Sequence, residues 1–313
     1  MARRTCRTSV PSEMSPTDED LARAAETIRA GGLVAFPTET VYGLGADALN
    51  PEAVAKIYEA KGRPWASPII VHVADENMAR AITAEWPPLA RQLAERFWPG
   101  PLTIIIRKAP QIADVVTAGL DAVGVRVPAH PIALRLIQTA GVPIAAPSAN
   151  HFGGVSPTTA EHVRRGLGSR VNVILDGGPT QIGIESTVVS LRRSAPTVLR
   201  PGMISQAELE TVTGRVWDRE LNQPVLQESP GQNVRHYAPR TPLYLIEPGS
   251  QPPPGEGLIL EMPDDPRGFA NQLYAELHRA DTQNWAWIAI KKPPETAQWE
   301  GILDRLQRAS ARH

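Results

Sequence analysis

One segment near the amino terminus constrains the fold more than any other part of the chain. Leu33–Phe36 is a short apolar run that predicts a buried strand, and Pro37 ends it. A polar loop is predicted next, in which Gly43 and Gly45 let the backbone approach a ligand without a clashing Cβ. A helix is then predicted over Pro51–Ala60, because an asparagine cap precedes the proline and apolar residues recur at helical spacing. A strand, a loop and a helix in this order are typical of an α/β protein.

The rest of the chain repeats this alternation. Before the middle of the chain we predict two more helices, Asp18–Ala30 and Pro87–Arg96, and two more strands, Pro68–Val73 and Leu102–Ile106. Near the carboxyl end we predict strands Pro242–Glu247, Gly257–Glu261 and Trp285–Ile290, with helices Pro266–Ala280 and Trp299–Ala309. The 313 residues fit two domains. Alternation by itself would favour a doubly wound sheet.

Two cations lie where the helix Pro51–Ala60 is predicted to end. Lys61 and Arg63 are separated by one glycine, and Pro64 stops the helix. A point charge beside a planar guanidinium suits a phosphate chain. Cations are also common at helix carboxyl ends, where they stabilise the helix dipole. The pair therefore indicates either a phosphate site or an ordinary helix terminus.

Polar side chains also follow two later strands. Ser148 and Asn150 come after the apolar run Ile144–Ala146, and Arg200 closes another strand-like run. Ligands of α/β sheets gather at strand ends. A capped helix is predicted from Ala160, and its first N–H groups either receive an anion or belong to a plain N-cap.

The order of these motifs identifies a family. The chain closely resembles the YrdC family of threonylcarbamoyl-AMP synthases in the succession of PTETVYGLG, KGRP, SPIIVHV, GVRVPAH, APSAN, ESTVV, LRPG and SPGQNVRHYAP. The resemblance covers about Asp18–Arg240, and the last motif followed by a small domain resembles the long, two-domain members. It implies an α/β fold with a strongly twisted, partly barrel-like mixed sheet, flanking helices and a concave pocket.

The resemblance implies an L-threonylcarbamoyladenylate synthase. Bicarbonate carboxylates the amine of L-threonine, the carbamate attacks the α-phosphorus of ATP, and pyrophosphate leaves. The product passes to the tRNA threonylcarbamoyl-transfer machinery, without any need for this protein to bind tRNA itself. Such a transfer rests on positioning and charge neutralisation, so it needs no covalent nucleophile. The lone Cys6, in a basic amino-terminal stretch, agrees with that expectation.

The resemblance also assigns the site residues. It implies that ATP binds at Lys61, Arg63, Ser67, Ala122, Ser148, Asn150, Ser156, Arg200 and Tyr237, with Lys61 and Arg63 as the catalytic residues. It implies that threonine binds at Thr40, His72, Arg126, Ala146 and Ser186. Arg126 suits a carboxylate because its guanidinium can bind two oxygens at once. From alternation alone, His72 and Arg126 are equally well explained as polar residues of ordinary strands.

Magnesium is implied by ATP, because Mg²⁺ is usually held by substrate phosphates and one or two carboxylates. The sequence names no protein ligand for it. Glu39 and Glu185 are the carboxylates nearest the predicted pocket, but glutamates on loops are common.

The linker before the small domain is predicted to close over the pocket. It is polar, contains prolines and ends in the RHYAP motif, so Tyr237 would approach the nucleotide. The alternative is that this segment is only a spacer, which Tyr237 anchors in place. We predict a disordered tail, a catalytic domain, a linker or lid and a small carboxyl-terminal α/β domain over residues 1–16, 17–217, 218–241 and 242–313.

Charge and hydropathy exclude several classes of protein. The net charge of −1 and a pI near 6.7 argue against a nucleic-acid-binding protein, for which a strongly basic face is expected. No apolar run is long enough to span a membrane, and no secretory signal is visible, so we expect a cytoplasmic protein. Two alternatives remain: a non-catalytic double-stranded RNA-binding protein, and a carbamoyl-transfer domain of the hydrogenase-maturation type. The latter chains carry zinc-finger cysteines, which this sequence lacks.

Overall fold

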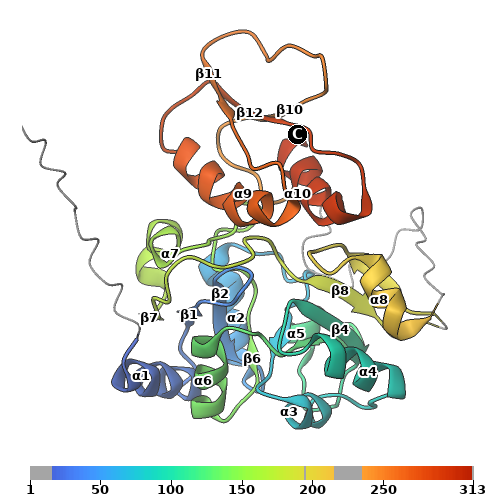
Figure 1. Cartoon of the computed structure of the whole chain (residues 1–313). Coiled ribbons are helices and arrows are strands. Elements are labelled where there is room, and N and C mark those ends of the chain that lie inside the picture. The colour runs from blue at the N-terminus through green and yellow to red at the C-terminus, as the bar shows by residue number, and fades with distance from the viewer. Residues whose placement is uncertain (1–15, 194, 215–234, 312–313) are drawn as a thin grey trace, which may run out of the picture.

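The computed structural model describes residues 16–193, 195–214 and 235–311. The predicted tail, apart from Pro16, and Cys6 within it lie outside the described residues, as does most of the predicted linker. The chain forms a large domain and a smaller carboxyl-terminal domain, which lie one above the other in Figure 1.

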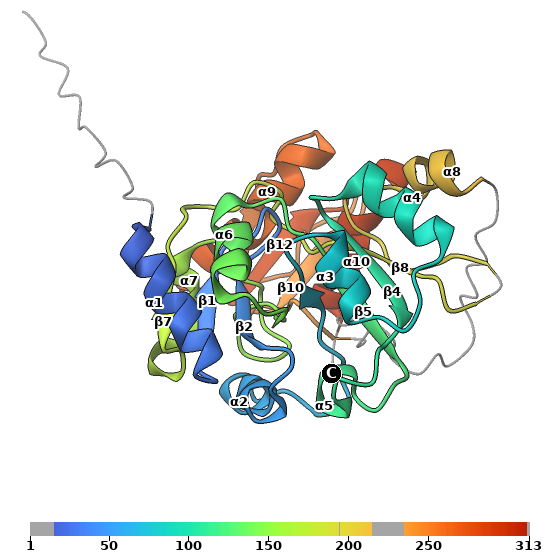
Figure 2. The ribbon, with the colours of Figure 1, turned by 90° about the horizontal axis from the view of Figure 1, so that it is seen from below.

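The large domain is built on a nine-stranded mixed sheet with flanking helices. Across the sheet, the strands follow the order β7 (Val173–Ile174), β1 (Val34–Phe36), β2 (Gly43–Asp47), β6 (Ile144–Ala145), β3 (Val71–His72), β5 (Ala122–Arg126), β4 (Leu102–Arg107), β8 (Thr187–Ser190) and β9 (Thr197–Arg200). The helices are α1 (Asp18–Arg29), α2 (Pro51–Lys61), α3 (Glu76–Ala81), α4 (Pro88–Phe97), α5 (Asp114–Thr117), α6 (Pro131–Ala140), α7 (Ala160–Gly166) and α8 (Gln206–Thr213). Helices α1 and α6 pack side by side, as Figures 1 and 2 both show. The predicted mixed α/β class is confirmed, and a doubly wound sheet is not what forms.

Strand β2 corrects the sequence analysis, which predicted a loop around Gly43 and Gly45. These residues pair antiparallel with β1 instead. A Cβ on Gly45 would lie 2.7 Å from the side chains of Phe36 and Ile144, so this glycine serves close packing inside the sheet. The loop is limited to the residues between β1 and β2.

Helix α2 begins and ends as its sequence predicts. The Asn50 side chain accepts hydrogen bonds from the backbone N–H groups of the first turn, and Pro51 follows as the first helical residue. Gly62 ends the helix in the left-handed region, with φ of 61°. This turn directs Lys61 into the protein, where it is buried.

The carboxyl-terminal domain has three parallel strands in the order β10 (Leu243–Ile246), β12 (Trp287–Lys291) and β11 (Gly257–Leu260). Helices α9 (Pro266–Ala280) and α10 (Glu300–Ser310) lie between this sheet and the large domain (Figure 1). The predicted helix Pro266–Ala280 is confirmed in full.

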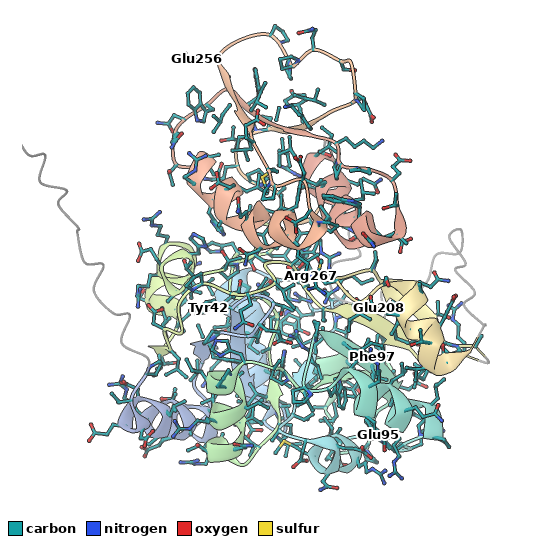
Figure 3. All side chains as sticks on the ribbon, viewed as in Figure 1. Tyr42, Glu95, Phe97, Glu208, Glu256 and Arg267 are labelled. Carbon is teal, nitrogen blue, oxygen red and sulfur yellow. The ribbon has the colours of Figure 1, made fainter. Side chains whose placement is uncertain are left out.

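One apolar cluster joins the two domains. The stripe Phe269, Leu273 and Leu277 of α9 is core, as predicted, and the same cluster includes Val41 and Ile184 of the large domain. Side chains fill the space between the helices of the small domain and the large domain, and Arg267 marks this boundary in Figure 3. The small domain is therefore docked through a continuous core.

Within the described ranges, no helix combines the length and the apolar character that crossing a membrane requires.

Candidate functional site

A small cavity lies where several strands of the large sheet end. Parallel β3 and β5 end side by side at His72 and Arg126. Antiparallel β9 returns Arg200 to the start of β8, beside Ser186. The cavity measures about 50 Å³, and its wall consists of Thr38, Thr40, Val41, Gly43, Arg63, Ile70, His72, Arg126, Ala146, Pro147, Ser148, Glu185, Ser186, Arg200, His236 and Tyr237.

Most of the predicted site residues meet in this wall. Every residue predicted for threonine lines the cavity: Thr40, His72, Arg126, Ala146 and Ser186. Of those predicted for ATP, the wall includes Arg63, Ser148, Arg200 and Tyr237. Segments that are far apart in sequence therefore converge on one place.

The other residues predicted for ATP lie outside the wall, and three of them contact it. Lys61 Nζ donates to the carbonyl oxygens of Ser148 and Asn150, each at 2.5 Å. Ser67 Oγ accepts from Arg63 Nη2 at 2.7 Å, and Ser156 Oγ donates to Glu185 Oε1 at 2.6 Å. The two remaining residues differ: Asn150 offers its carbonyl to Lys61, whereas Ala122 pairs with Arg107 at the far end of β5. Ala122 is thus not brought to the cavity.

The cavity is strongly cationic. Arg63, Arg126 and Arg200 line it, and Glu185 is the carboxylate in its described wall. Burial and then the neighbouring Arg63 lower the pKa of Lys61, which sits behind the wall, well below its usual value. An excess of positive charge around a cavity favours anionic ligands.

Arg126 is already engaged by protein groups. Its Nη2 lies 2.6 Å from Glu39 Oε1, an ion pair whose angle is not that of an aligned hydrogen bond. Its Nη1 donates to Thr40 Oγ1 at 3.0 Å, and its Nε donates to the Gly100 carbonyl at 3.1 Å. Glu39 also accepts from the Ala129 N–H at 3.0 Å. A carboxylate ligand would therefore have to displace Glu39 before it could pair with the Arg126 guanidinium.

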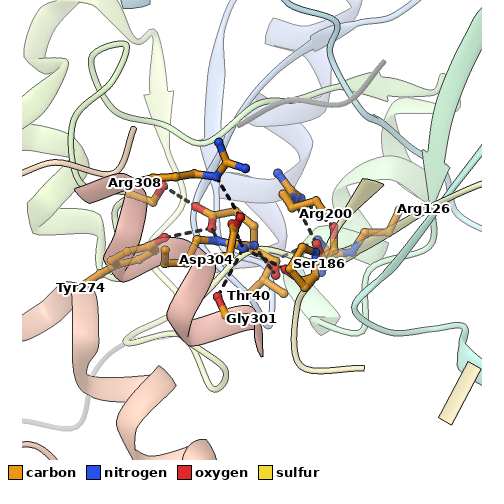
Figure 4. A network of polar contacts seen from close by, with 12 residues as sticks. Thr40, Arg126, Ser186, Arg200, Tyr274, Gly301, Asp304 and Arg308 are labelled. Carbon is orange, nitrogen blue, oxygen red and sulfur yellow. Dashed lines mark hydrogen bonds and ion pairs between the residues drawn. The ribbon is translucent and has the colours of Figure 1, made fainter. Parts of the chain in front are cut away.

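Arg200 and Ser186 form a second polar group in the wall. Arg200 Nη2 donates to Ser186 Oγ at 3.1 Å, and its Nε donates to the Ser186 carbonyl at 3.1 Å. Ser186 Oγ also bonds the Thr103 hydroxyl at 2.8 Å. Figure 4 shows Arg200, Ser186, Thr40 and Arg126 close together in this network.

His72 is buried and neutral. Burial and then Arg126 lower its pKa to about 3, and its ring meets Phe36 edge-on at 6.0 Å. A neutral imidazole can hydrogen-bond a ligand but is a poor proton shuttle near neutral pH.

Glu185 is held by three partners on the side away from the cavity. Oε1 accepts from Ser156 Oγ at 2.6 Å, and Oε2 accepts from Tyr274 at 3.0 Å and from Arg305 Nε at 2.8 Å. Burial raises the pKa of Glu185, but Arg305, Arg200 and the Ser156 hydroxyl lower it more, to about 2. Ser156 thus acts on the cavity through a carboxylate.

These contacts bear on magnesium. Both carboxylates named in the sequence analysis are engaged, Glu39 by Arg126 and Ala129 and Glu185 by its three partners. In the ranges that the structure covers, no group of three acidic, histidine or cysteine side chains could hold a metal ion. The donor set does not fit a metal bound by the protein alone.

The end of the linker fills one side of the cavity. His236 and Tyr237 line it and are almost fully buried, and Tyr237 adopts a φ of 59°, which is rare outside glycine. The Ala238 N–H donates to the Gly153 carbonyl at 3.0 Å. The Tyr237 hydroxyl has no hydrogen-bond partner among the described residues.

The sequence analysis missed some residues of the site. Thr38 and Ile70 each lie two positions from a predicted residue of the wall, so neighbourhood could have indicated them. Arg305 and Tyr274 gave no such signal, because they belong to helices of the other domain.

Comparisons with known proteins agree with this geometry. The family model named Sua5_yciO_yrdC and described as "Telomere recombination" matches residues 26–202. A second model, described as "Threonylcarbamoyl-AMP synthase, C-terminal domain", matches residues 204–311.

Individual relatives are similar over most of the chain. Threonylcarbamoyl-AMP synthase of Bacillus subtilis is 50% identical over 241 residues, which are 76% of this chain and 70% of that protein. The protein of the same name from Pyrococcus abyssi is 48% identical over 72% of this chain and 67% of its own length. The crystal structure of P. abyssi Sua5 complexed with L-threonine superposes with a TM-score of 0.88 at 36% identity, covering 95% of this chain and 96% of that one.

Proposed function

The chain belongs to the Sua5/YrdC family in its long, two-domain form, and from that premise we propose that it makes threonylcarbamoyl-AMP and pyrophosphate from ATP, L-threonine and bicarbonate. Family membership makes it a threonylcarbamoyl-AMP synthase, a transferase of tRNA modification. Bicarbonate as co-substrate, transfer of the product to the tRNA-modifying machinery and a cytoplasmic location, where ATP and tRNA are found, are the finer parts of the proposal.

One observation carries the proposal most directly. Arg126 ends β5, Arg200 ends β9 and Arg63 follows α2, and all three line the same cavity. ATP, a carbamate and a threonine carboxylate are all anions, and their reaction gathers negative charge at the α-phosphorus. Guanidinium groups fixed around that point would stabilise this charge without having to reorganise.

The threonine end of the cavity is proposed at Arg126. Thr40, His72 and Ser186 surround it with short polar groups, and Ala146 leaves room for the substrate. In this proposal the threonine carboxylate takes the place of Glu39 on Arg126. The nucleotide then lies toward Arg63 and Arg200.

The proposal requires the linker end to move. A cavity of about 50 Å³ holds a water molecule or two, whereas ligand sites usually measure about 300 to 1,000 Å³. His236 and Tyr237 occupy one side of it, so we propose that they withdraw to admit ATP and return to exclude water during reaction. Lys61 would turn from its two carbonyl partners to the phosphates.

Magnesium is proposed to arrive with ATP. Glu185 accepts hydrogen bonds on both oxygens and Glu39 is ion-paired with Arg126 in this structure, so the phosphates themselves would supply most of the ligands.

The direct test is release of pyrophosphate by the full-length protein. We expect release only when ATP, L-threonine and bicarbonate are present together. ATP turnover that ignored threonine would contradict the proposal, and use of carbamoyl phosphate would favour the hydrogenase-maturation type. RNA binding that weakens with salt, without any turnover, would favour the RNA-binding alternative.

The phosphate site is tested by Arg63→Ala and Lys61→Ala. Each change removes a charge-assisted contact worth about 1.5 to 3 kcal/mol, so ATP affinity should fall roughly ten- to hundredfold. Arg23→Ala is the matched control, because Arg23 lies exposed on α1 and pairs only locally with Asp20. Unchanged ATP affinity in the first two variants would contradict these roles.

A further inference from the structure

Arg305 of α10 is the largest fully buried side chain of the described protein, and it belongs to the small domain. Its Nε donates to Glu185 Oε2 at 2.8 Å, and its Nη2 donates to the Glu185 carbonyl at 3.4 Å. Its Nη1 donates to the Pro201 carbonyl and to Asp304 Oδ2, each at 2.8 Å. A buried arginine persists only where such partners satisfy it.

The partners of Arg305 adjoin the cavity. Glu185 directly precedes Ser186, and Pro201 directly follows Arg200, two residues that line the wall. Arg200 and Ser186 are hydrogen-bonded to each other, and the Arg305 guanidinium of the other domain binds the residue next to each of them.

Close backbone packing fixes the helix that carries Arg305. A Cβ on Gly301 would lie 2.7 Å from the Gly202 carbonyl oxygen, so α10 touches this turn backbone to backbone. Figure 4 shows Gly301, Asp304 and Tyr274 of the small domain converging on this network. The geometry leaves Arg305 little freedom to follow a moving carboxylate.

Without Arg305, Glu185 would have other cations to approach. Arg200 lowers the pKa of Glu185 electrostatically, and Glu185 raises that of Lys61, so both cations lie within its field. Among the described residues, however, the ion pair of Glu185 is with Arg305. Tyr274 and Ser156 also donate hydrogen bonds to the Glu185 carboxylate. The Arg305 guanidinium lies 5.2 Å from the ring centroid of Tyr237.

We propose that Arg305 is a positioning residue of the ATP site: it holds the Glu185 carboxylate toward the small domain and so keeps that carboxylate from pairing with Lys61 and Arg200, the cations proposed for phosphate. The small domain thereby completes the nucleotide site without contacting substrate. This inference rests on the proposed function for its ligand, and it predicts a loss specific to ATP rather than to threonine.

The experiment measures ATP and threonine KM from pyrophosphate release, together with the affinity for a non-hydrolysable ATP analogue. Arg305→Gln should raise the ATP KM and weaken analogue binding at least tenfold, while the threonine KM changes less than twofold. Arg305→Lys, which keeps the charge, should show a rise of only about threefold. Arg279→Gln, an exposed arginine of α9 paired with Glu276, is the control and should match the wild type.

A second variant separates positioning from folding. In a Glu185→Gln background there is no carboxylate to hold, so adding Arg305→Gln should change analogue affinity less than twofold. A larger change in that background, or an equal rise of both KM values in Arg305→Gln, would overturn the inference. If the wild type binds the analogue but releases no pyrophosphate, the proposed function fails, while the analogue affinities of the variants still decide the role of Arg305.

Discussion

Two buried arginine–glutamate pairs flank the cavity, and they are arranged in opposite senses. In the pair of Arg126 and Glu39, the arginine lines the cavity and the glutamate lies behind it. In the pair of Arg305 and Glu185, the glutamate lines the cavity and the arginine lies behind it, in the other domain. The first pair leaves a cation facing the cavity, whereas in the second the cavity-lining carboxylate is bound by partners outside the wall.

The two pairs also differ in how fully the hydrogen-bonding capacity of their carboxylates is used. Glu185 has hydrogen-bonding partners on both oxygens, from three segments of the chain. The Glu39–Arg126 contact is poorly aligned, so another carboxylate could replace Glu39 at modest cost. We therefore interpret the first pair as exchangeable and the second as permanent.

The largest expected effect is on stability, at the permanent pair. Arg305→Met leaves a buried carboxylate without its cation and should lower the free energy of unfolding by about 3 to 5 kcal/mol. Denaturant unfolding of the full chain measures it. Adding Glu185→Gln should recover most of the loss, and Arg279→Met should stay within about 0.5 kcal/mol of the wild type. A small effect of Arg305→Met would mean that the Arg305–Glu185 pair is no more permanent than the Arg126–Glu39 pair.

At the exchangeable pair we expect an effect on binding instead. Arg126→Ala should weaken threonine binding by about 1.5 to 3 kcal/mol, or roughly ten- to hundredfold, because a charge-assisted contact to the carboxylate is lost. ATP binding should be retained. Calorimetric titration with each substrate measures this selectivity, and an equal loss of both would indicate a folding defect.

A pH titration probes the same domain interface at a pair of stacked histidines. His162 of α7 stacks on His278 of α9 with ring centroids 3.9 Å apart. Burial, and then His278, lower the pKa of His162 to about 3, and burial lowers that of His278. Both folded pKa values lie below the unfolded value of 6.5, so this stabilisation is complete above pH 6.5 and is lost progressively as the pH falls below it.

Because both rings are half-buried, we expect this loss to reach only roughly 1 to 2 kcal/mol. Thermal unfolding of the wild type and of His278→Gln, compared from pH 7.5 to pH 5, measures it. The variant should show a flatter pH dependence, and identical slopes would argue against the stack as the cause.

The smallest effect is expected from Glu39→Gln. If the substrate carboxylate must displace Glu39 from Arg126, removing that charge should tighten threonine binding severalfold, or by less than about 1 kcal/mol. The same titration detects it. Weaker threonine binding would mean that Glu39 supports the bound state, and that the first pair is as permanent as the second.

Much of the site was accessible from sequence because its residues follow local signals. Arg200 follows an apolar strand, Asn50 caps α2, and motif order placed Thr40 and Arg126 in the same pocket. Ala122 was assigned on the resemblance alone, and the structure leaves it at the far end of its strand.

Arg305 could not be found in this way. Its carboxylate partner is 120 positions away in sequence, and nothing around it in α10 differs from an ordinary amphipathic helix. Lys61 shows the same limit: its sequence position indicated phosphate, yet its ammonium binds two backbone carbonyls from a distant loop.

The sequence by itself determined most of the longer helices, most strands, the family and the chemical types gathered at the site, because caps, periodicity and motif order act over a few residues. The tertiary structure decided which carboxylate faces which guanidinium, and that His236 and Tyr237 line the cavity. Those outcomes depend on how the two domains dock. The strength of a buried charge pair depends on the distance between the two charges, which no local sequence pattern specifies.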